Sequence, residues 1–201
     1  MSRPLNLAEF ENETEIGAYI LDFRPGDQFI NGFIPGSFYM CQAFVASGIS
    51  SEVISVSENI IVVTPKTREE SAMKSLKKLG YENFDGWLKG GFETWKESGN
   101  TIDLIISIEA DELMMDMKFD DPQIIDIRSK EAYDINHLEG AENIPPLNLL
   151  YNLEELPRET TFYMYCDDGE MSTSVISVLK NHGFHNFYHI TGGYEALRNV
   201  M

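Results

Sequence analysis

Short apolar runs alternate with helical patterns along the first half of the chain. Residues 18–21 and 60–63 are apolar, and the second run is a continuous segment of the kind found in buried parallel strands. Between residues 68 and 79 apolar positions recur at helical spacing, and Gly80 follows as a residue that ends helices. The pattern predicts two strands and an amphipathic helix, with a further short helix over 25–31.

The second half repeats this alternation. Residues 123–125 and 162–165 form apolar runs, and a helical pattern over 171–181 stops near Gly183. Strands that alternate with helices build parallel sheets covered by helices. We therefore predict an α/β protein with two domains, each a parallel sheet flanked by helices on both faces.

The two halves also share individual residues. An Asp-x-Arg triplet follows the first apolar run of each half, and a Gly-Gly pair comes near its end. These landmarks are Asp22-Phe23-Arg24 and Gly90-Gly91 in the first half, and Asp126-Ile127-Arg128 and Gly192-Gly193 in the second. A period of roughly 100 residues is too long for a solenoid repeat and suits two copies of one domain. We expect the domains over 1–101 and 102–201.

Only the second copy carries a cysteine at a matching point. Thr64 and Cys166 each lie 26 residues before the glycine pair of their half. Both follow an apolar strand and precede a helix, and open α/β folds place their sites at this edge of the sheet. This difference between the copies is the strongest indication of function.

Composition and charge argue against some classes of binding partner. The 201 residues carry a formal net charge of −18, and the isoelectric point is about 4.4. Such a balance disfavours nucleic acid and anionic membranes, whose phosphates it repels. Two cysteines in different copies make a disulfide framework improbable, and no apolar stretch has the length of a membrane span or a secretory signal. We expect a cytoplasmic protein.

The second copy contains an ordered set of motifs: Asp126-Ile127-Arg128, Tyr133, His137 to Pro145, Tyr165 to Ser172, Gly183 to Asn186 and Gly192 to Ala196. The first copy contains Asp22-Phe23-Arg24, Gly32 to Ser37, Gly80 to Asn83 and Lys89 to Trp95. In both copies these motifs resemble those of the rhodanese family. The resemblance implies a rhodanese-like sulfurtransferase that works without a cofactor, and the pair is similar to the tandem rhodanese region attached to some bacterial metallo-β-lactamase-fold proteins. The metal-binding segment of that hydrolase is absent from this sequence.

The resemblance implies that Cys166 is the catalytic residue. Its thiolate would attack a sulfane sulfur, become a persulfide, and pass the outer sulfur to an acceptor. Loop N–H groups and the positive end of the next helix favour the thiolate. Asp126 and Arg128 are expected to support the loop. The residues expected to contact the substrate are Asp167, Asp168, Gly169, Glu170, Met171 and Ser172.

The loop departs from the family pattern in its charge. Met171 stands where the family usually has arginine. Three carboxylates, those of Asp167, Asp168 and Glu170, closely follow the cysteine in sequence. A carboxylate at about 6 to 8 Å disfavours a thiolate by roughly 0.5 to 2 kcal/mol, whereas a helix N-terminus returns about 0.3 to 1 kcal/mol. Thiosulfate is therefore expected to be a poor donor and phosphatase activity is disfavoured. A neutral or cationic sulfur donor, or a protein persulfide carrier, suits the loop better.

Three functions stay open at this point, and with them whether the chain is an enzyme. The first is sulfur transfer or persulfide carriage through Cys166. The second is a catalytically degenerate pair of domains that binds or scaffolds a protein, with Cys166 as a core residue. The third is regulation through oxidation of Cys166. Oligomeric state is not predicted.

The first copy and the histidines carry weaker signals. Thr64-Pro65-Lys66-Thr67-Arg68 replaces the cysteine loop, and an unassisted threonine hydroxyl is inert, so the first domain is expected to be structural or to dock a partner. His182, His185 and His189 are close in sequence but fall on a helix end, a turn and a strand. They should point apart, and no metal site is predicted.

Overall fold

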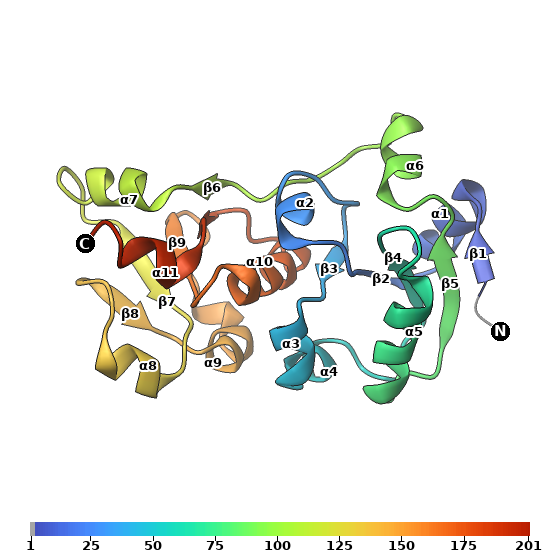
Figure 1. Ribbon diagram of the computed structural model, residues 1–201, viewed down its shortest axis with the longest axis horizontal. Helices are drawn as coiled ribbons and strands as arrows, with labels where there is room; N and C mark the ends of the chain where they lie inside the picture. Colours follow the sequence, from blue (N-terminus) through green and yellow to red (C-terminus); the bar gives the residue numbers. More distant parts are fainter. Residues whose placement is uncertain (1–2) are drawn as a thin grey trace. The chain divides into compact units, whose positions relative to one another are not determined.

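The computed structural model describes residues 3–201, and the chain divides after Leu104 into two compact units. The predicted boundary after residue 101 falls just before this point. Each unit is built on its own sheet, and each sheet has five strands that all pair in parallel. The predicted α/β fold, two parallel sheets flanked by helices, is confirmed (Figure 1).

The sheet of the first unit has the strand order β1-β5-β4-β2-β3. Its central strand β4 is the apolar run predicted over 60–63, and all four of its residues are buried. The strands are β1 (Arg3–Leu5), β2 (Tyr19–Asp22), β3 (Ser37–Tyr39), β4 (Ile60–Val63) and β5 (Phe84–Leu88). The helices are α1 (Leu7–Glu15), α2 (Gly26–Ile30), α3 (Gln42–Ala46), α4 (Ile49–Val53), α5 (Glu69–Lys78) and α6 (Phe92–Glu97).

The sheet of the second unit repeats this order as β6-β10-β9-β7-β8. Its central strand β9 is the second predicted apolar run, over 162–165. The strands are β6 (Ser107–Ile108), β7 (Gln123–Asp126), β8 (Ala141–Asn143), β9 (Phe162–Tyr165) and β10 (Phe187–Ile190). The helices are α7 (Ala110–Asp116), α8 (Lys130–Ile135), α9 (Pro146–Tyr151), the 3-10 turn η1 (Leu153–Glu155), α10 (Glu170–Asn181) and α11 (Gly193–Leu197).

Local sequence explains where several helices begin. Asn6 accepts a hydrogen bond from the Glu9 backbone N–H at 3.0 Å, and the Glu9 carboxylate accepts one from the Asn6 N–H at 2.8 Å. This reciprocal capping box satisfies two donors at the start of α1. Ser129 caps α8 through the N–H of Ala132. Helix α10 instead begins after Gly169, whose φ of +94° is a left-handed conformation that favours glycine.

Each unit has its own hydrophobic core. In both, apolar side chains from the central strands pack with apolar side chains of the surrounding helices. The cluster in the first unit consists of Leu5, Phe10, Ile20, Ile34, Ile61, Val63, Leu88 and Phe92. The cluster in the second unit consists of Ala110, Leu113, Ile124, Leu138, Ala141, Tyr165, Ile190 and Leu197. Each sheet is therefore stabilised by side chains of its own unit.

Candidate functional site

The candidate site lies where the central strand of the second unit meets a helix. Cys166 directly follows β9, and α10 begins four residues later at Glu170. All strands of this sheet are parallel, so the carboxyl end of β9 is the edge at which open α/β folds place their sites. Cys166 is buried, with 3% of its surface exposed, so its thiol lies inside the turn.

Backbone N–H groups of the loop point at the sulfur. The N–H of Gly169 donates to Cys166 Sγ at 3.1 Å, and the N–H of Ser172 donates at 3.4 Å. The hydroxyl of Ser172 lies 3.5 Å from the same sulfur. The loop thus forms a small nest of donors around one atom, an arrangement that stabilises negative charge.

Burial and a nearby carboxylate both raise the pKa of the thiol and so oppose the effect of these donors. Burial raises the pKa of the Cys166 thiol above its ordinary value, and the side chain and N–H of Ser172 lower that pKa in part. The Asp168 carboxylate, whose Oδ1 lies 3.7 Å from Sγ, raises the pKa further. The thiol is therefore less acidic than a free cysteine, although its donors are in position.

Asp126 and Arg128 form a buried pair beside the loop. The Arg128 guanidinium donates to Asp126 through Nε at 3.0 Å and through Nη2 at 2.6 Å, and Nη2 also donates to the Asn136 carbonyl at 2.7 Å. Its Nη1 lies 3.9 Å from Asp167 Oδ1. No basic residue lies near the loop carboxylates in sequence, but the fold brings Arg128 to Asp167.

The Gly192-Gly193 turn holds the loop from its other side. The N–H of Tyr194 donates to the Cys166 carbonyl at 2.8 Å, and the N–H of Glu195 donates to the Asp167 carbonyl at 2.9 Å. A Cβ on Gly193 would lie 2.5 Å from the Cys166 carbonyl oxygen. In the sequence this pair is only a landmark of the repeat and part of a family motif, so its contact with the cysteine loop is not predicted.

His189 also belongs to the site and was missed as such. It lies on β10 and is buried, with Nε2 3.1 Å from the Gly169 carbonyl and Nδ1 3.2 Å from the Ser107 hydroxyl. His182 and His185 are exposed. Over residues 3–201, no group of three or more His, Cys, Asp or Glu side chains is arranged to hold a metal ion.

The remaining residues of the cysteine loop are exposed or half-buried. Asp167 and Asp168 are exposed, whereas Glu170 and Met171 are half-buried in the first turn of α10. Met171 occupies the position at which the family pattern expects arginine. The loop therefore presents carboxylates to solvent with an apolar side chain beside them.

The first unit has the same frame without the cysteine. Arg24 donates to Asp22 through Nη2 at 2.7 Å and to the Gly32 carbonyl at 2.8 Å, and its guanidinium stacks 4.0 Å from the centre of the Phe92 ring. In the second unit Arg128 stacks on Tyr194 at 3.7 Å. Thr64 takes the place of Cys166 at the end of β4 and is buried.

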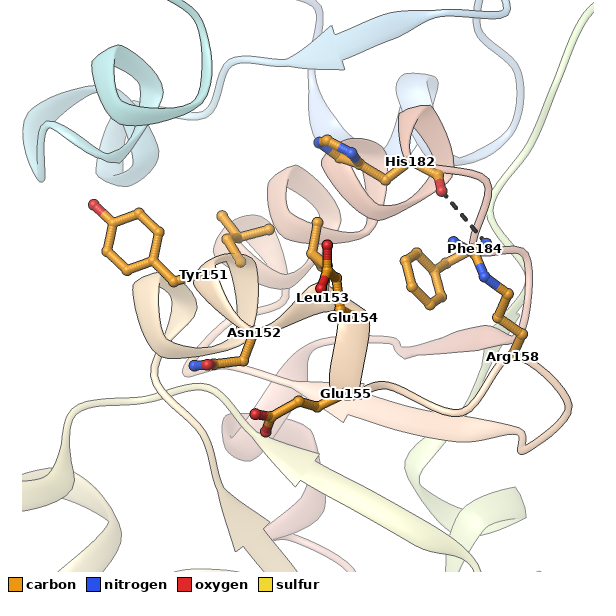
Figure 2. A pocket seen from close by; sticks show the side chains of 9 residues that line it. Tyr151, Asn152, Leu153, Glu154, Glu155, Arg158, His182 and Phe184 are labelled. Carbon is orange, nitrogen blue, oxygen red and sulfur yellow. Dashed lines mark hydrogen bonds between the residues drawn. The ribbon is translucent and has the colours of Figure 1, made fainter.

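A pocket of about 470 Å³ lies away from this loop (Figure 2). It is formed at the C-terminal end of α10, where Arg158 donates to the Gly183 carbonyl at 3.1 Å and stacks on Phe184. Helix α10 has 12 residues and spans about 18 Å, so this pocket is separated from Cys166 by the length of the helix. None of the described helices is long and apolar enough to cross a membrane.

Comparison with known proteins places the chain in a family. The sequence model of the Rhodanese-like domain matches residues 6–98 and 109–199. The chain belongs to the rhodanese-like family. Both units carry the domain, so the tandem arrangement predicted from the repeat is confirmed.

Its relatives include named sulfurtransferases. The adenylyltransferase and sulfurtransferase uba4 of Ogataea parapolymorpha is 39% identical over 74 residues, which are 36% of this chain and 19% of that protein. The thiosulfate sulfurtransferase GlpE of Vibrio cholerae is 26% identical over 93 residues, 46% of this chain and 86% of GlpE. The chain thus matches about a fifth of the length of uba4.

Solved rhodanese-like structures match the chain as well. A rhodanese-like domain protein from Staphylococcus aureus covers 46% of this chain, with 91% of its own length, 28% identity and a TM-score of 0.44. The 3-mercaptopyruvate sulfotransferase SseA from Escherichia coli covers 96% of this chain, with 99% of its own length, 15% identity and a TM-score of 0.43.

Proposed function

We propose that the second unit transfers or carries sulfane sulfur through Cys166. The observation that carries the proposal is the position of the sulfur at the end of β9, where it accepts the N–H groups of Gly169 and Ser172. The same donors that stabilise a thiolate also stabilise a terminal persulfide anion, because both are compact sulfur anions. Family membership and sulfurtransferase relatives support this chemistry.

The reaction exchanges one S–S bond for another. The Cys166 thiolate attacks the outer sulfur of a donor persulfide; the bond between that sulfur and the donor breaks, and the donor leaves as a thiolate. An acceptor thiolate then attacks the outer sulfur on Cys166, which leaves as a thiolate again. The thiol proton passes to solvent in the first step. No external oxidant or reductant is needed.

The donor is proposed to be a neutral or cationic persulfide, or a protein that carries one on a basic surface. Asp167 and Asp168 are exposed at the loop, and Arg128 is already paired with Asp126. Small dianions such as thiosulfate are repelled by this arrangement and by the net charge of −18. The same charge disfavours nucleic acid and anionic membranes as partners. A cytoplasmic location is part of this proposal.

Intact-mass measurement tests the proposal directly. The protein is exposed separately to glutathione persulfide and to thiosulfate, and a gain of one sulfur, about 32 Da, marks a persulfide. Cys166→Ser should abolish the gain. Cys41→Ser is the matched control, because Cys41 is also buried and also accepts a backbone N–H, from Phe44 at 3.3 Å.

The outcomes separate the competing functions. A gain on the wild-type protein and on Cys41→Ser, with glutathione persulfide exceeding thiosulfate, supports the proposal and its donor class. No gain from either donor would leave the scaffold function, which the raised pKa of Cys166 and the nearby Asp168 carboxylate favour. A gain of about 16 Da on mild oxidation, without sulfur uptake, would indicate the regulatory function.

We propose a structural or docking role for the first unit. Thr64 and its loop offer no activated nucleophile, although the Asp22–Arg24 frame is retained. The resemblance of the pair to the rhodanese region of metallo-β-lactamase-fold proteins stays a prediction.

A further inference from the structure

Helix α7 ends in two large apolar side chains that are exposed to solvent. Phe119 is 79% exposed and Met115 is 53% exposed. The N–H groups of Phe119 and Asp120 both donate to the Asp116 carbonyl at 2.9 Å, which continues the helical turn beyond the end of α7. Residues four apart lie on one side of such a turn, so Met115 and Phe119 form one apolar surface.

The other side of this turn is fixed to the core of the second unit. Leu113 is buried in the core cluster, and Met114 and Met117 pack against that cluster. The turn is therefore held in place from below while Met115 and Phe119 point outward. An apolar surface with a polar border, held on a packed element, is typical of a binding site for another protein.

Carboxylates border this apolar surface. Between residues 109 and 121 the sequence has six acidic residues and one lysine. Over residues 3–201, neither Asp116 nor Asp120 forms an ion pair with a lysine or arginine. We refer to Met115, Asp116, Phe119 and Asp120 together as the α7 surface.

A pair of tyrosines adjoins the two carboxylates. The Tyr163 hydroxyl donates to Asp116 Oδ2 at 3.4 Å; burial raises the pKa of Tyr163, and the charges of Asp116 and Asp120 raise it further. The rings of Tyr163 and Tyr188 are 5.4 Å apart at 76°, and both residues are half-buried. Because the face of a tyrosine ring attracts cations, the rings and the carboxylates favour the same kind of group, a guanidinium or an ammonium.

We propose that the α7 surface binds a basic segment of another protein, in which an apolar side chain lies beside arginine or lysine. The apolar side chain covers Phe119 and Met115, whose flexible thioether adapts to its shape, and the cations meet the carboxylates. A second copy of this chain is disfavoured by its net charge of −18, and nucleic acid and anionic membranes are disfavoured by their phosphates. A basic protein is the occupant that complements both features of the surface.

Binding at the α7 surface leaves the cysteine loop open. Tyr163 is the second residue of β9, and Cys166 follows three residues later, about 10 Å along an extended strand. The proposal therefore differs from binding of a sulfur donor at the loop, and it does not depend on sulfur transfer.

Fluorescence anisotropy of a labelled peptide tests the proposal on the full chain. The probe is a synthetic peptide of leucine and lysine whose leucines form one face of a helix, and the same peptide with serine in place of leucine is its control. Phe119→Ser should weaken binding of the leucine peptide by about tenfold, and Phe119→Leu should restore it to within about threefold of wild type. Ile135→Ser is the matched control variant, because Ile135 on α8 of the same unit is 80% exposed.

A second pair of variants tests the role of charge. Asp116→Asn combined with Asp120→Asn should weaken peptide binding by about three- to tenfold at low salt and should reduce its dependence on salt. Glu154→Gln combined with Glu155→Gln removes the same charge from two exposed residues elsewhere in the unit, and it should change the affinity by less than about twofold.

Several results would overturn the proposal. These are equal binding of the two peptides, equal affinity of wild type and Phe119→Ser, or equal losses from Phe119→Ser and Ile135→Ser. Protection of Cys166 from iodoacetamide by the bound peptide, measured in Cys41→Ser protein, would place the peptide on the cysteine loop instead. A dimer that Phe119→Ser dissociates would make a second copy the occupant. Thermal unfolding should be unchanged, because Phe119 is exposed, and no readout requires a sulfur donor, so failure here is separate from failure of the persulfide assay.

Discussion

Asp168 is the residue that most directly opposes ionisation of Cys166. Its Oδ1 lies 3.7 Å from the sulfur, and the carboxylate raises the pKa of the thiol. The same oxygen accepts the Glu170 N–H at 3.0 Å, so Asp168 also holds the turn. Because an asparagine keeps this acceptor and loses the charge, the two effects can be separated.

We expect Asp168→Asn to lower the pKa of Cys166 and to speed its alkylation near pH 7 by about three- to tenfold. In both proteins the rate rises with pH as the thiolate forms, and the asparagine variant should reach its plateau at lower pH. Asp167→Asn is the control, because its carboxylate is partly compensated by Arg128 Nη1 at 3.9 Å. An equal gain in both variants would argue against a specific effect of Asp168.

At the scale of single residues, the sequence predicted the cysteine and the carboxylates but not their compensation. Arg128 is far from Asp167 in sequence. Its place at the loop depends on the fold, in which the guanidinium donates to Asp126 and to the Asn136 carbonyl and stacks on Tyr194. His189 was considered only as a metal ligand. Its pairing with Gly169 depends on how β10 lies beside β9, which spacing along the chain does not reveal.

Continuous apolar runs were the most reliable predictor of strands. Strands β4 and β9 have the predicted bounds, because central strands of a parallel sheet are buried on both faces. Edge strand β8 has the sequence Ala-Glu-Asn, and its strand conformation comes from pairing with β7. Short strands of this kind are set by partners elsewhere in the chain and carry no pattern of their own.

The Gly192-Gly193 turn is an element whose replacement has a sharp expected result. Gly193 has a φ of +56°, and an added Cβ would lie 2.5 Å from the Cys166 carbonyl oxygen. Gly193→Ala should displace the loop, slow alkylation of Cys166 by at least about tenfold, and destabilise the unit by more than the roughly 1 to 2 kcal/mol of backbone strain.

Gly140→Ala is the matched control for this change. Gly140 also has a positive φ, of +85°, but its added Cβ meets nothing within 4 Å. Only the strain of about 1 to 2 kcal/mol is expected there, with the alkylation rate unchanged. Denaturant unfolding gives the stabilities, and equal losses in the two variants would contradict the proposed contact.

The two units together contain the same Asp–Arg frame twice and the loop cysteine once. The buried pairs Asp22–Arg24 and Asp126–Arg128 have N–O distances of 2.7 and 2.6 Å. Each arginine also donates to a carbonyl and stacks on an aromatic ring in its own unit. The duplicated frame provides a matched control for a change made to the Asp126–Arg128 pair.

Arg128→Lys and Arg24→Lys form such a pair. Lysine keeps the charge but loses the forked donors and the flat stacking surface, so each variant should lose about 1 to 3 kcal/mol of stability. Arg128→Lys, and not Arg24→Lys, is expected also to change the pH profile of Cys166 alkylation, because Arg128 lies 3.9 Å from Asp167 of the cysteine loop. A similar change in the pH profile caused by Arg24→Lys would show that the Asp–Arg pairs affect the thiol only through the stability of the fold.

The hydrogen bonds from Tyr194 and Glu195 to the cysteine loop also bear on how the protein is made. During synthesis Cys166 leaves the ribosome well before these residues do, and its carbonyl then lacks the donors that fix the turn. The loop then has its own N–H groups but not the two hydrogen bonds that hold it against α11. The cysteine loop is therefore complete only after α11 has been translated and has closed on it, and the sulfur chemistry proposed for Cys166 would have to wait for this step.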